Sequence, residues 1–179
     1  MKLLRKLKQL FYRFSNSEIE MNLQEKITAN FTLGELLYSG TAVRLGLKNI
    51  PNDVQLAHLK ESAHGLFQKV RDVLNQPIQI NSGFRCDAVN KAVGGSKTSA
   101  HCNGYAIDFV CPKFGTPFEI AVFLARELPK KGFKFDQIIL EFDSWVHIGF
   151  KNTEGMQRGQ VLTAKKVGGK TVYFSGVVK

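Results

Sequence analysis

A carboxylate inside an apolar strand segment is the feature that most constrains how this chain folds. Residues 105–110 alternate as a β-strand does, and Asp108 would lie among apolar neighbours on one face of that strand. A buried charge is costly there unless a partner or a metal ion compensates it. Asn103 and Gly104 supply a turn just before the strand, which can bring His101 back beside Asp108.

His147 has similar support from its neighbours. Residues 136–142 and 145–150 read as two strands joined by a tight turn at Asp143 and Ser144. Because side chains alternate along a strand, His147 shares a face with Trp145 and is held on a rigid element, as a catalytic site requires.

Two histidines and one carboxylate form a zinc set that leaves one coordination position open, which is typical of catalytic rather than structural zinc. If His101, Asp108 and His147 converge, the chain is a metallohydrolase. The alternative for any single histidine is a packed or surface role, which is the commoner use of this residue. The chain has four: His58, His64, His101 and His147.

Several spaced motifs carry a family resemblance. The pattern Ser-x-His-x-x-Gly-x-Ala-x-Asp over residues 99–108, followed by Trp-x-His over 145–147, resembles the zinc D-Ala-D-Ala carboxypeptidases and related peptidoglycan peptidases. Residues 81–85 and 89–96 resemble the substrate-side strand and loop of that family. Residues 30–36 with 49–51 resemble the helical lead-in of its phage and prophage branch.

The resemblance covers about residues 28–150 and implies the hedgehog-like α+β fold of this family. We expect a mostly antiparallel sheet with N-terminal helices, and a C-terminal β extension of the same domain over 151–179. Local patterns predict helices and strands in agreement with this fold. The predicted helices cover 33–45, capped by Thr32 and Glu35, then 51–74 and 117–128, and further strands cover 78–82 and 171–178.

The resemblance also implies roles for individual residues. His101, Asp108 and His147 correspond to the zinc ligands. Arg85 corresponds to an arginine that holds a substrate carboxylate or carbonyl, with an ordinary surface salt bridge as the alternative. Ser99 corresponds to a hydroxyl that contacts substrate or supports a ligand, and a loop-capping serine is the alternative.

The sequence offers two candidates for the catalytic base, because the position where many relatives carry a carboxylate is Ser144. Glu141 and Asp143 are the nearby carboxylates. Glu141 ends a strand, whereas aspartate is common in turns for conformational reasons, so Glu141 is favoured. The alternative is a weak or inactive member that has lost its base.

The implied function is zinc-dependent hydrolysis of peptidoglycan stem peptides, at a D-Ala-D-Ala or an L-Ala-D-Glu type bond, as a carboxypeptidase or an endolysin-like endopeptidase. Zinc would activate a water molecule, a carboxylate would accept its proton, and zinc with Arg85 would stabilise the oxyanion. The alternative is a non-catalytic zinc-binding module for cell-wall binding or virion assembly. We expect a monomer, in the host cytoplasm or in a virion, that acts on the cell wall.

Composition agrees with this reading. A chain of 179 residues with 44% hydrophobic residues predicts one domain with a compact core. The net charge of +10 suits anionic cell wall or lipid, and no nucleic-acid motif accompanies it, so no nucleic-acid partner is expected. Cys86, Cys102 and Cys111 are expected to be free thiols, although a metal role for Cys102, next to His101, stays open.

Residues 1–20 form a separate basic segment. Over residues 1–15, leucines and phenylalanines fall at helical spacing between lysines and arginines, which predicts a basic amphipathic helix. It lacks the uninterrupted apolar region of a cleavable signal peptide. It could lie on an anionic membrane surface, pack on the domain, or be a frayed terminus.

Overall fold

The computed structural model describes residues 21–179, which form one six-stranded sheet with helices packed against it. The amphipathic helix predicted over residues 1–15 lies outside the described residues. In the described part, no helix is both long and apolar enough to cross a membrane. The helical elements are α2 (Leu33–Leu36), α3 (Gly40–Leu45), α4 (Asp53–Ser62), the π-helix η1 (Ala63–Phe67), α5 (Gln68–Leu74), α6 (Asp87–Ala92), the 3-10 helix η2 (Ala100–Asn103) and α7 (Pro117–Lys130). The strands are β1 (Gln79–Ser82), β2 (Ala106–Val110), β3 (Gln137–Glu141), β4 (Trp145–Gly149), β5 (Gln160–Val167) and β6 (Lys170–Ser175).

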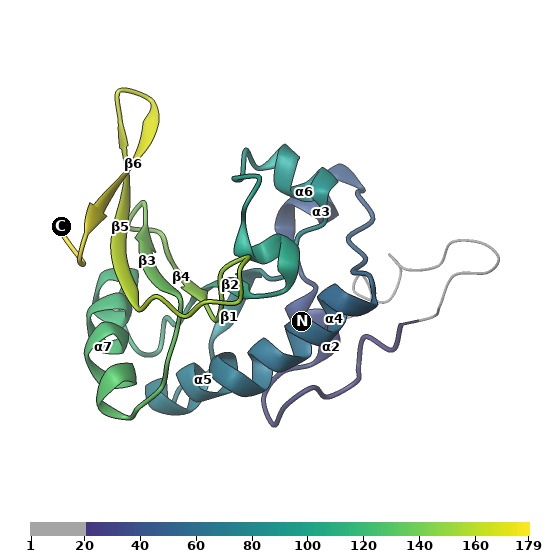
Figure 1. Ribbon diagram of the computed structural model, residues 1–179, viewed down its shortest axis with the longest axis horizontal. Helices are drawn as coiled ribbons and strands as arrows, with labels where there is room; N and C mark the ends of the chain where they lie inside the picture. Colours follow the sequence, from purple (N-terminus) through teal and green to yellow (C-terminus); the bar gives the residue numbers. More distant parts are fainter. Residues whose placement is uncertain (1–20) are drawn as a thin grey trace.

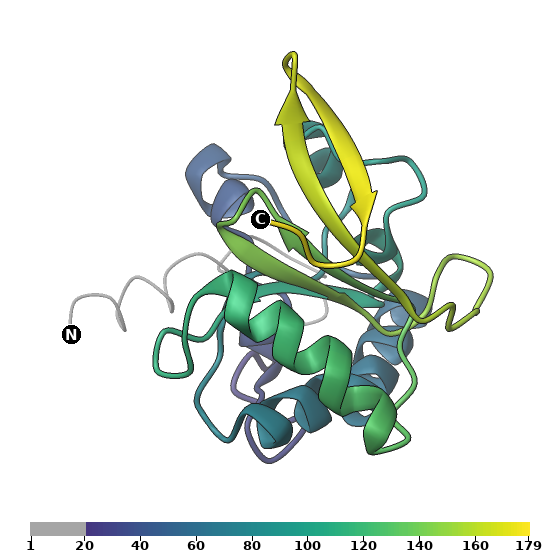
Figure 2. The same cartoon turned by 90° about the vertical axis from the view of Figure 1, so that its left-hand side faces the viewer.

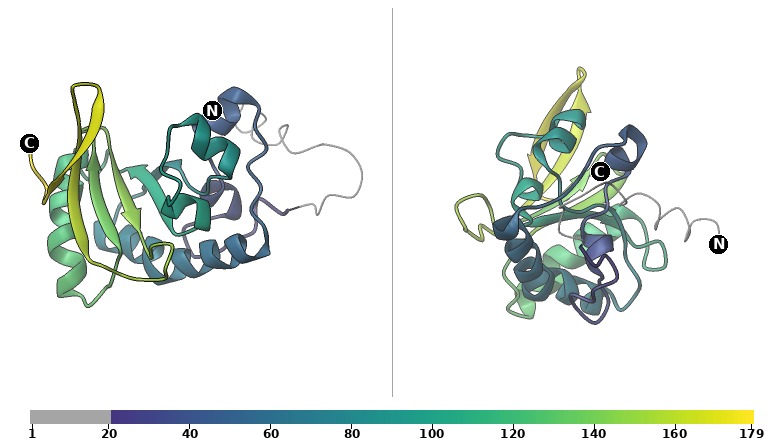
Figure 3. Two further views of the ribbon diagram at one scale, coloured as in Figure 1. Left: turned by 45° about the horizontal axis from the view of Figure 1, so that its top comes forward. Right: turned by 90° about the vertical axis from the view of Figure 1, so that its right-hand side faces the viewer.

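The sheet has the strand order β1-β2-β4-β3-β5-β6 (Figure 1). Every neighbouring pair is antiparallel except β3 and β5, which run parallel because residues 150–159 carry the chain back along the sheet. The predicted α+β class is confirmed. Figure 3 shows the last two strands as a hairpin that projects beyond the other strands.

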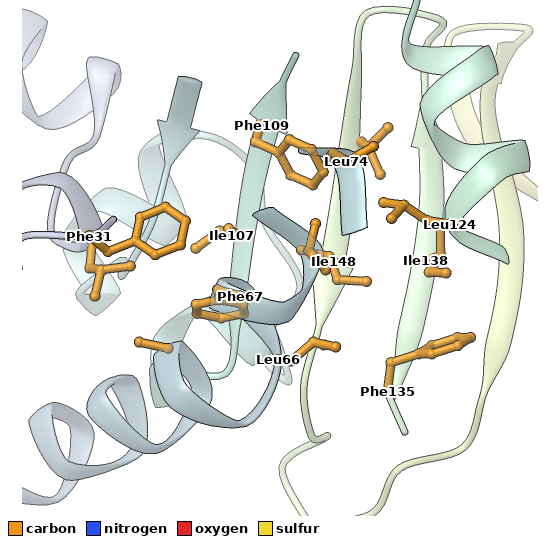
Figure 4. Packing of buried hydrophobic residues seen from close by; sticks show 14 of the residues in the cluster. Phe31, Leu66, Phe67, Leu74, Ile107, Phe109, Leu124, Phe135, Ile138 and Ile148 are labelled. Carbon is orange, nitrogen blue, oxygen red and sulfur yellow. The ribbon is translucent and has the colours of Figure 1, made fainter. Parts of the chain in front are cut away.

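One face of the sheet is covered by helices and forms the core. Helix α7 lies across this face (Figure 2) and begins with a capping box, in which Thr116 and Glu119 each bond the other's backbone amide. Alternate residues of β3 and β4 point into the core, including Leu140 and, in Figure 4, Ile138 and Ile148. Each such side chain stabilises the fold by about 1.5–3 kcal/mol. The opposite face of the strands is left for polar residues.

The single helix predicted over residues 33–45 is wrong, because the structure has two short helices there. Helix α2 ends at Leu36, and Ser39 caps α3 with its side chain. Between them, the carbonyls of Leu36 and Tyr38 accept hydrogen bonds from Phe84 and Gly83, in the loop after β1. The helix is interrupted here because these carbonyls accept hydrogen bonds from the loop after β1 and not from the backbone amides of a further helical turn.

The helix predicted over residues 51–74 also differs in detail. It begins at Asp53, because Asn52 is the N-cap and forms a capping box with Gln55. It contains the π-helical turn η1, where Gly65 lies against the ring of Phe150. A Cβ on Gly65 would lie 2.6 Å from that ring, so the missing side chain allows the helix to approach the end of β4.

Candidate metal centre and active site

Three elements that are distant in sequence bring His101, Asp108 and His147 together. Asp108 lies in the middle of β2 and pairs directly with His147 on β4, so both side chains project from the same face of the sheet. His101 lies in η2, which the turn ending at Gly104 folds back over β2. Gly104 has a φ of 76°, in the left-handed region that glycine adopts without strain.

The three side chains form a tight, buried cluster. Nε2 of His101 lies 3.1 Å from Oδ1 of Asp108 and 3.1 Å from Nδ1 of His147, and that Nδ1 lies 2.9 Å from the same oxygen. The exposed fractions are 1%, 6% and 7%. In the part of the chain that the structure describes, this is the one group of His, Cys, Asp and Glu residues found able to hold a metal ion. Two imidazole nitrogens and a carboxylate oxygen fit zinc.

The backbone of Gly83 orients His101. Its carbonyl oxygen lies 2.8 Å from Nδ1, and because a carbonyl only accepts, Nδ1 carries the proton and Nε2 presents its lone pair to the cluster. Such an outer partner commonly fixes the tautomer of a metal-binding histidine. Gly83 is itself held against α2, where a Cβ would lie 1.9 Å from the carbonyl oxygen of Leu36.

The charges within the cluster are strongly coupled. Burial alone would raise the pKa of Asp108, but the adjacent His101 and His147 outweigh burial and hold it well below its usual range. Burial lowers the pKa of His101 to about 4, despite the opposing effect of Asp108. For His147, burial opposes the charged form, but the hydrogen bond and charge of Asp108 prevail and raise its pKa. The site therefore holds an ionised carboxylate beside a neutral His101.

Arg85 reaches into the same cluster from the loop after β1. Its Nη2 lies 3.9 Å from Oδ2 of Asp108, and only 14% of its side chain is exposed. Its Nε is buried and has no hydrogen-bond partner among the described residues. Arg85 is therefore a largely buried arginine whose ion pair is with the Asp108 carboxylate of the cluster, and its role toward a substrate stays a prediction.

Glu141 lies on the same face of the sheet as the cluster. It pairs with Trp145 across the β3–β4 hairpin, two residues before His147, and its Oε2 accepts a hydrogen bond of 3.0 Å from the indole Nε1. Burial raises the pKa of this carboxyl, and the charge of Asp108 raises it further, against the effects of His147 and Trp145. A half-buried carboxyl with a raised pKa suits proton transfer near neutral pH.

The other candidate residues lie outside the cluster. Asp143 is exposed in the turn, with a φ of 52°, and Ser144 donates its hydroxyl to the carbonyl of Phe142. Ser99 is half-buried just before η2, and among the described residues its hydroxyl has no hydrogen-bond partner. Cys102 is a half-buried free thiol outside the metal-binding group.

Two features of the site were not predicted from the sequence. The bond from Trp145 to Glu141 was missed because the two-residue turn predicted at Asp143 and Ser144 would pair Glu141 with Val146, whereas Phe142 also belongs to the connection and Glu141 pairs with Trp145. The carbonyl of Gly83 that orients His101 was missed because a backbone contact over 18 residues leaves no mark in the pattern of side chains.

Comparison with known proteins agrees with the geometry. A search of curated proteins finds no match. A family model described as Peptidase M15 matches residues 29–149, a span that contains His101, Asp108, His147, Arg85 and Glu141. Peptidases of this family depend on zinc, and the cluster described above could bind such an ion. Because the match covers more than half of the chain, this protein belongs to the Peptidase M15 family.

Proposed function

We propose that this protein is a zinc-dependent peptidase that hydrolyses peptide bonds in peptidoglycan stem peptides, at a D-Ala-D-Ala or an L-Ala-D-Glu type bond. The buried cluster of His101, Asp108 and His147 is the observation that carries the proposal. Its donor set fits zinc, and His101 is oriented with its free lone pair toward the other two ligands.

In this proposal His101, Asp108 and His147 hold the zinc ion. When bound, zinc supplies Lewis acidity, which polarises a carbonyl and makes water a better nucleophile. Glu141 accepts a proton from the attacking water at a carboxylate oxygen and delivers it to the leaving amine. Its raised pKa suits both directions of transfer. Arg85 donates hydrogen bonds to a substrate carboxylate or carbonyl, and Ser99 offers a hydroxyl at the edge of the site.

The second candidate is a non-catalytic zinc-binding module for cell-wall binding or virion assembly. Glu141 favours the enzyme over this module, because a half-buried carboxyl held by Trp145 on the same sheet face as the cluster has the environment of a catalytic base. We further propose a hedgehog-like fold and a phage or prophage origin. We also propose that the protein acts on the cell wall from the host cytoplasm or from a virion. Residues 1–15 would then lie on an anionic membrane surface.

Digestion of purified peptidoglycan, followed by mass spectrometry of the released peptides, tests this function. We expect the zinc-loaded protein to release a defined set of peptides that identifies the bond cut. The His101→Ala, His147→Ala double variant is the control and should release none. If the wild-type protein binds peptidoglycan but releases no peptide, the non-catalytic module is correct instead.

A further inference from the structure

The sheet continues past the part of the chain that matches the Peptidase M15 model. Strands β5 and β6 follow residue 149 and extend the sheet beyond β3. Glu141 pairs with Ala164 on β5, and Ala164 pairs with Tyr173 on β6. Because directly paired residues share a face, Ala164 and Tyr173 lie on the face that carries Glu141 and the metal-binding cluster.

Tyr173 is open to a ligand. Tyr173 is 55% exposed, and among the described residues its hydroxyl has no hydrogen-bond partner. Ala164, the residue between Tyr173 and Glu141, carries only a methyl group and is fully buried, so the side chains that cover it, and not Ala164 itself, form the surface between them. The backbones of Tyr173 and Glu141 are two strands apart, a separation of about 10 Å. A single extended peptide residue is shorter than this separation. A substrate must therefore continue for more than one residue beyond the scissile bond to reach Tyr173.

The phenol lies within electrostatic range of the site. Burial raises the pKa of Tyr173, and the carboxylates of Glu141 and Asp108 raise it further. Figure 1 shows the β5–β6 hairpin and the α6 segment rising at the top of the view, with the other strands below and between them. The hairpin therefore flanks the candidate site on the side away from the loop that carries Arg85.

We propose that Tyr173 is a substrate-positioning residue, whose ring supports the part of an extended peptide that passes from the scissile bond over β5 and β6. An aromatic ring offers a large contact area and loses little conformational entropy when it is ordered. The inference rests on the proposed function and deepens it, since it assigns longer stem peptides, rather than the shortest cleavable peptide, as the preferred substrates.

The test compares Tyr173→Ala and Tyr173→Phe with wild type on a series of stem peptides. The series starts from the shortest peptide that is cleaved and is lengthened by one residue at a time at either end. Tyr173→Ala should lower kcat/KM about tenfold on the longer peptides, the scale of one aromatic contact, mainly through KM. The shortest peptide should be cleaved equally well by both proteins. Tyr173→Phe keeps the ring and should behave as wild type.

Val172→Ala is the matched control, because Val172 is the neighbouring residue on β6, also exposed, and its side chain faces the other side of the sheet. It should leave kcat/KM unchanged at every length. An equal loss for Tyr173→Ala at all lengths, no loss at any length, or a Tyr173→Phe variant as weak as Tyr173→Ala overturns the proposed ring contact.

Failure of the proposed function gives a different result. If the wild-type protein cleaves none of the peptides, calorimetric titration into the zinc-loaded protein replaces kinetics, with a series that starts from the shortest stem peptide that binds. Tyr173→Ala should then weaken binding of the longer peptides about tenfold and leave the shortest unchanged. Equal affinities of the variant and wild type for the longer peptides would overturn the role of Tyr173, whatever the protein does with its substrates.

Discussion

At the scale of single residues, the candidate metal centre depends on the positions of His101, Asp108 and His147 relative to one another. Nδ1 of His147 lies 2.9 Å from Oδ1 of Asp108 and can donate a hydrogen bond to it, whereas Nε2 of His101 presents a lone pair to the same oxygen, so without an ion only His147 compensates the carboxylate. Removing one histidine leaves two of the three metal ligands in place. Removing both leaves the carboxylate as the sole member of the set, which is too few ligands for zinc.

We therefore predict that zinc content falls from about one equivalent per chain to near zero in the His101→Ala, His147→Ala double variant. Elemental analysis of purified, dialysed protein measures this directly. His64→Ala is the matched control, because His64 is exposed and outside the cluster, and it should keep its zinc. Full zinc content in the double variant would show that these histidines are not the ligands.

The base has its own prediction. Glu141→Gln keeps the size of the side chain and removes the proton acceptor, so activity should fall about 100-fold or more while zinc content is unchanged. Asp143→Asn, in the exposed turn two residues on, should keep nearly full activity. Peptide-cleavage kinetics for both variants decide the assignment. If Asp143→Asn loses activity and Glu141→Gln does not, Asp143 is the base.

At the scale of secondary-structure elements, the sequence predicted those parts whose signals are local. The start of α7 at Pro117 and the capping box of Thr32 and Glu35 were predicted, because an N-terminal proline and a capping box act within one turn. The strand positions of Asp108 and His147 were predicted from alternation alone. The break before Ser39 was missed, because it depends on hydrogen bonds to the loop after β1. The parallel pairing of β5 with β3 was missed for the same reason, since local patterns do not specify which strand is the neighbour.

Gly83 connects the segment between α2 and α3 to the metal-binding cluster, because its amide bonds the carbonyl of Tyr38 and its carbonyl accepts from His101. Its substitution gives the third prediction. A Cβ there would lie 1.9 Å from the carbonyl oxygen of Leu36, so α2 or the loop must move. We expect Gly83→Ala to lower the free energy of unfolding by about 3 kcal/mol, the upper range for overpacking. The carbonyl that orients His101 also shifts, so zinc affinity should fall about 10–100-fold.

Denaturant unfolding and zinc titration of the same variant measure these two effects. Gly40→Ala is the control, because a Cβ at the start of α3 would meet only the hydroxyl of Tyr38, at 3.7 Å. It should change the free energy of unfolding by no more than about 1 kcal/mol. Wild-type stability and zinc affinity in Gly83→Ala would contradict the close packing of α2 against this loop.

At the scale of the whole molecule, the sheet is the platform that joins the parts. Its core face packs on α5 and α7, which fixes the strands, and its other face carries Asp108, His147 and Glu141 from three adjacent strands. Since zinc would connect the sheet to His101 in η2, binding of the ion should stabilise the entire fold and not only the site.

The last prediction concerns how this stabilisation depends on pH. In zinc-free protein, the pKa of His101 is lowered to about 4, so its contribution to stability is lost as pH falls below about 6.5. The pKa of His147 is raised, so the stability it contributes is present below about 6.5 and is lost as pH rises through its folded-state value. Zinc requires neutral imidazoles and therefore competes with the proton on His147 until that pH is passed.

The increase in melting temperature on adding zinc to chelator-treated protein should thus be larger at pH 8 than at pH 6. At zinc concentrations about 1,000 times the Kd, linkage gives about 4 kcal/mol, which is on the order of 10 °C for a domain of this size. Thermal melts at the two pH values, with and without zinc, measure the difference. The His101→Ala, His147→Ala double variant should show no zinc-dependent shift at either pH. A shift of equal size in wild type at pH 6 and pH 8 would mean that zinc does not displace a proton from His147.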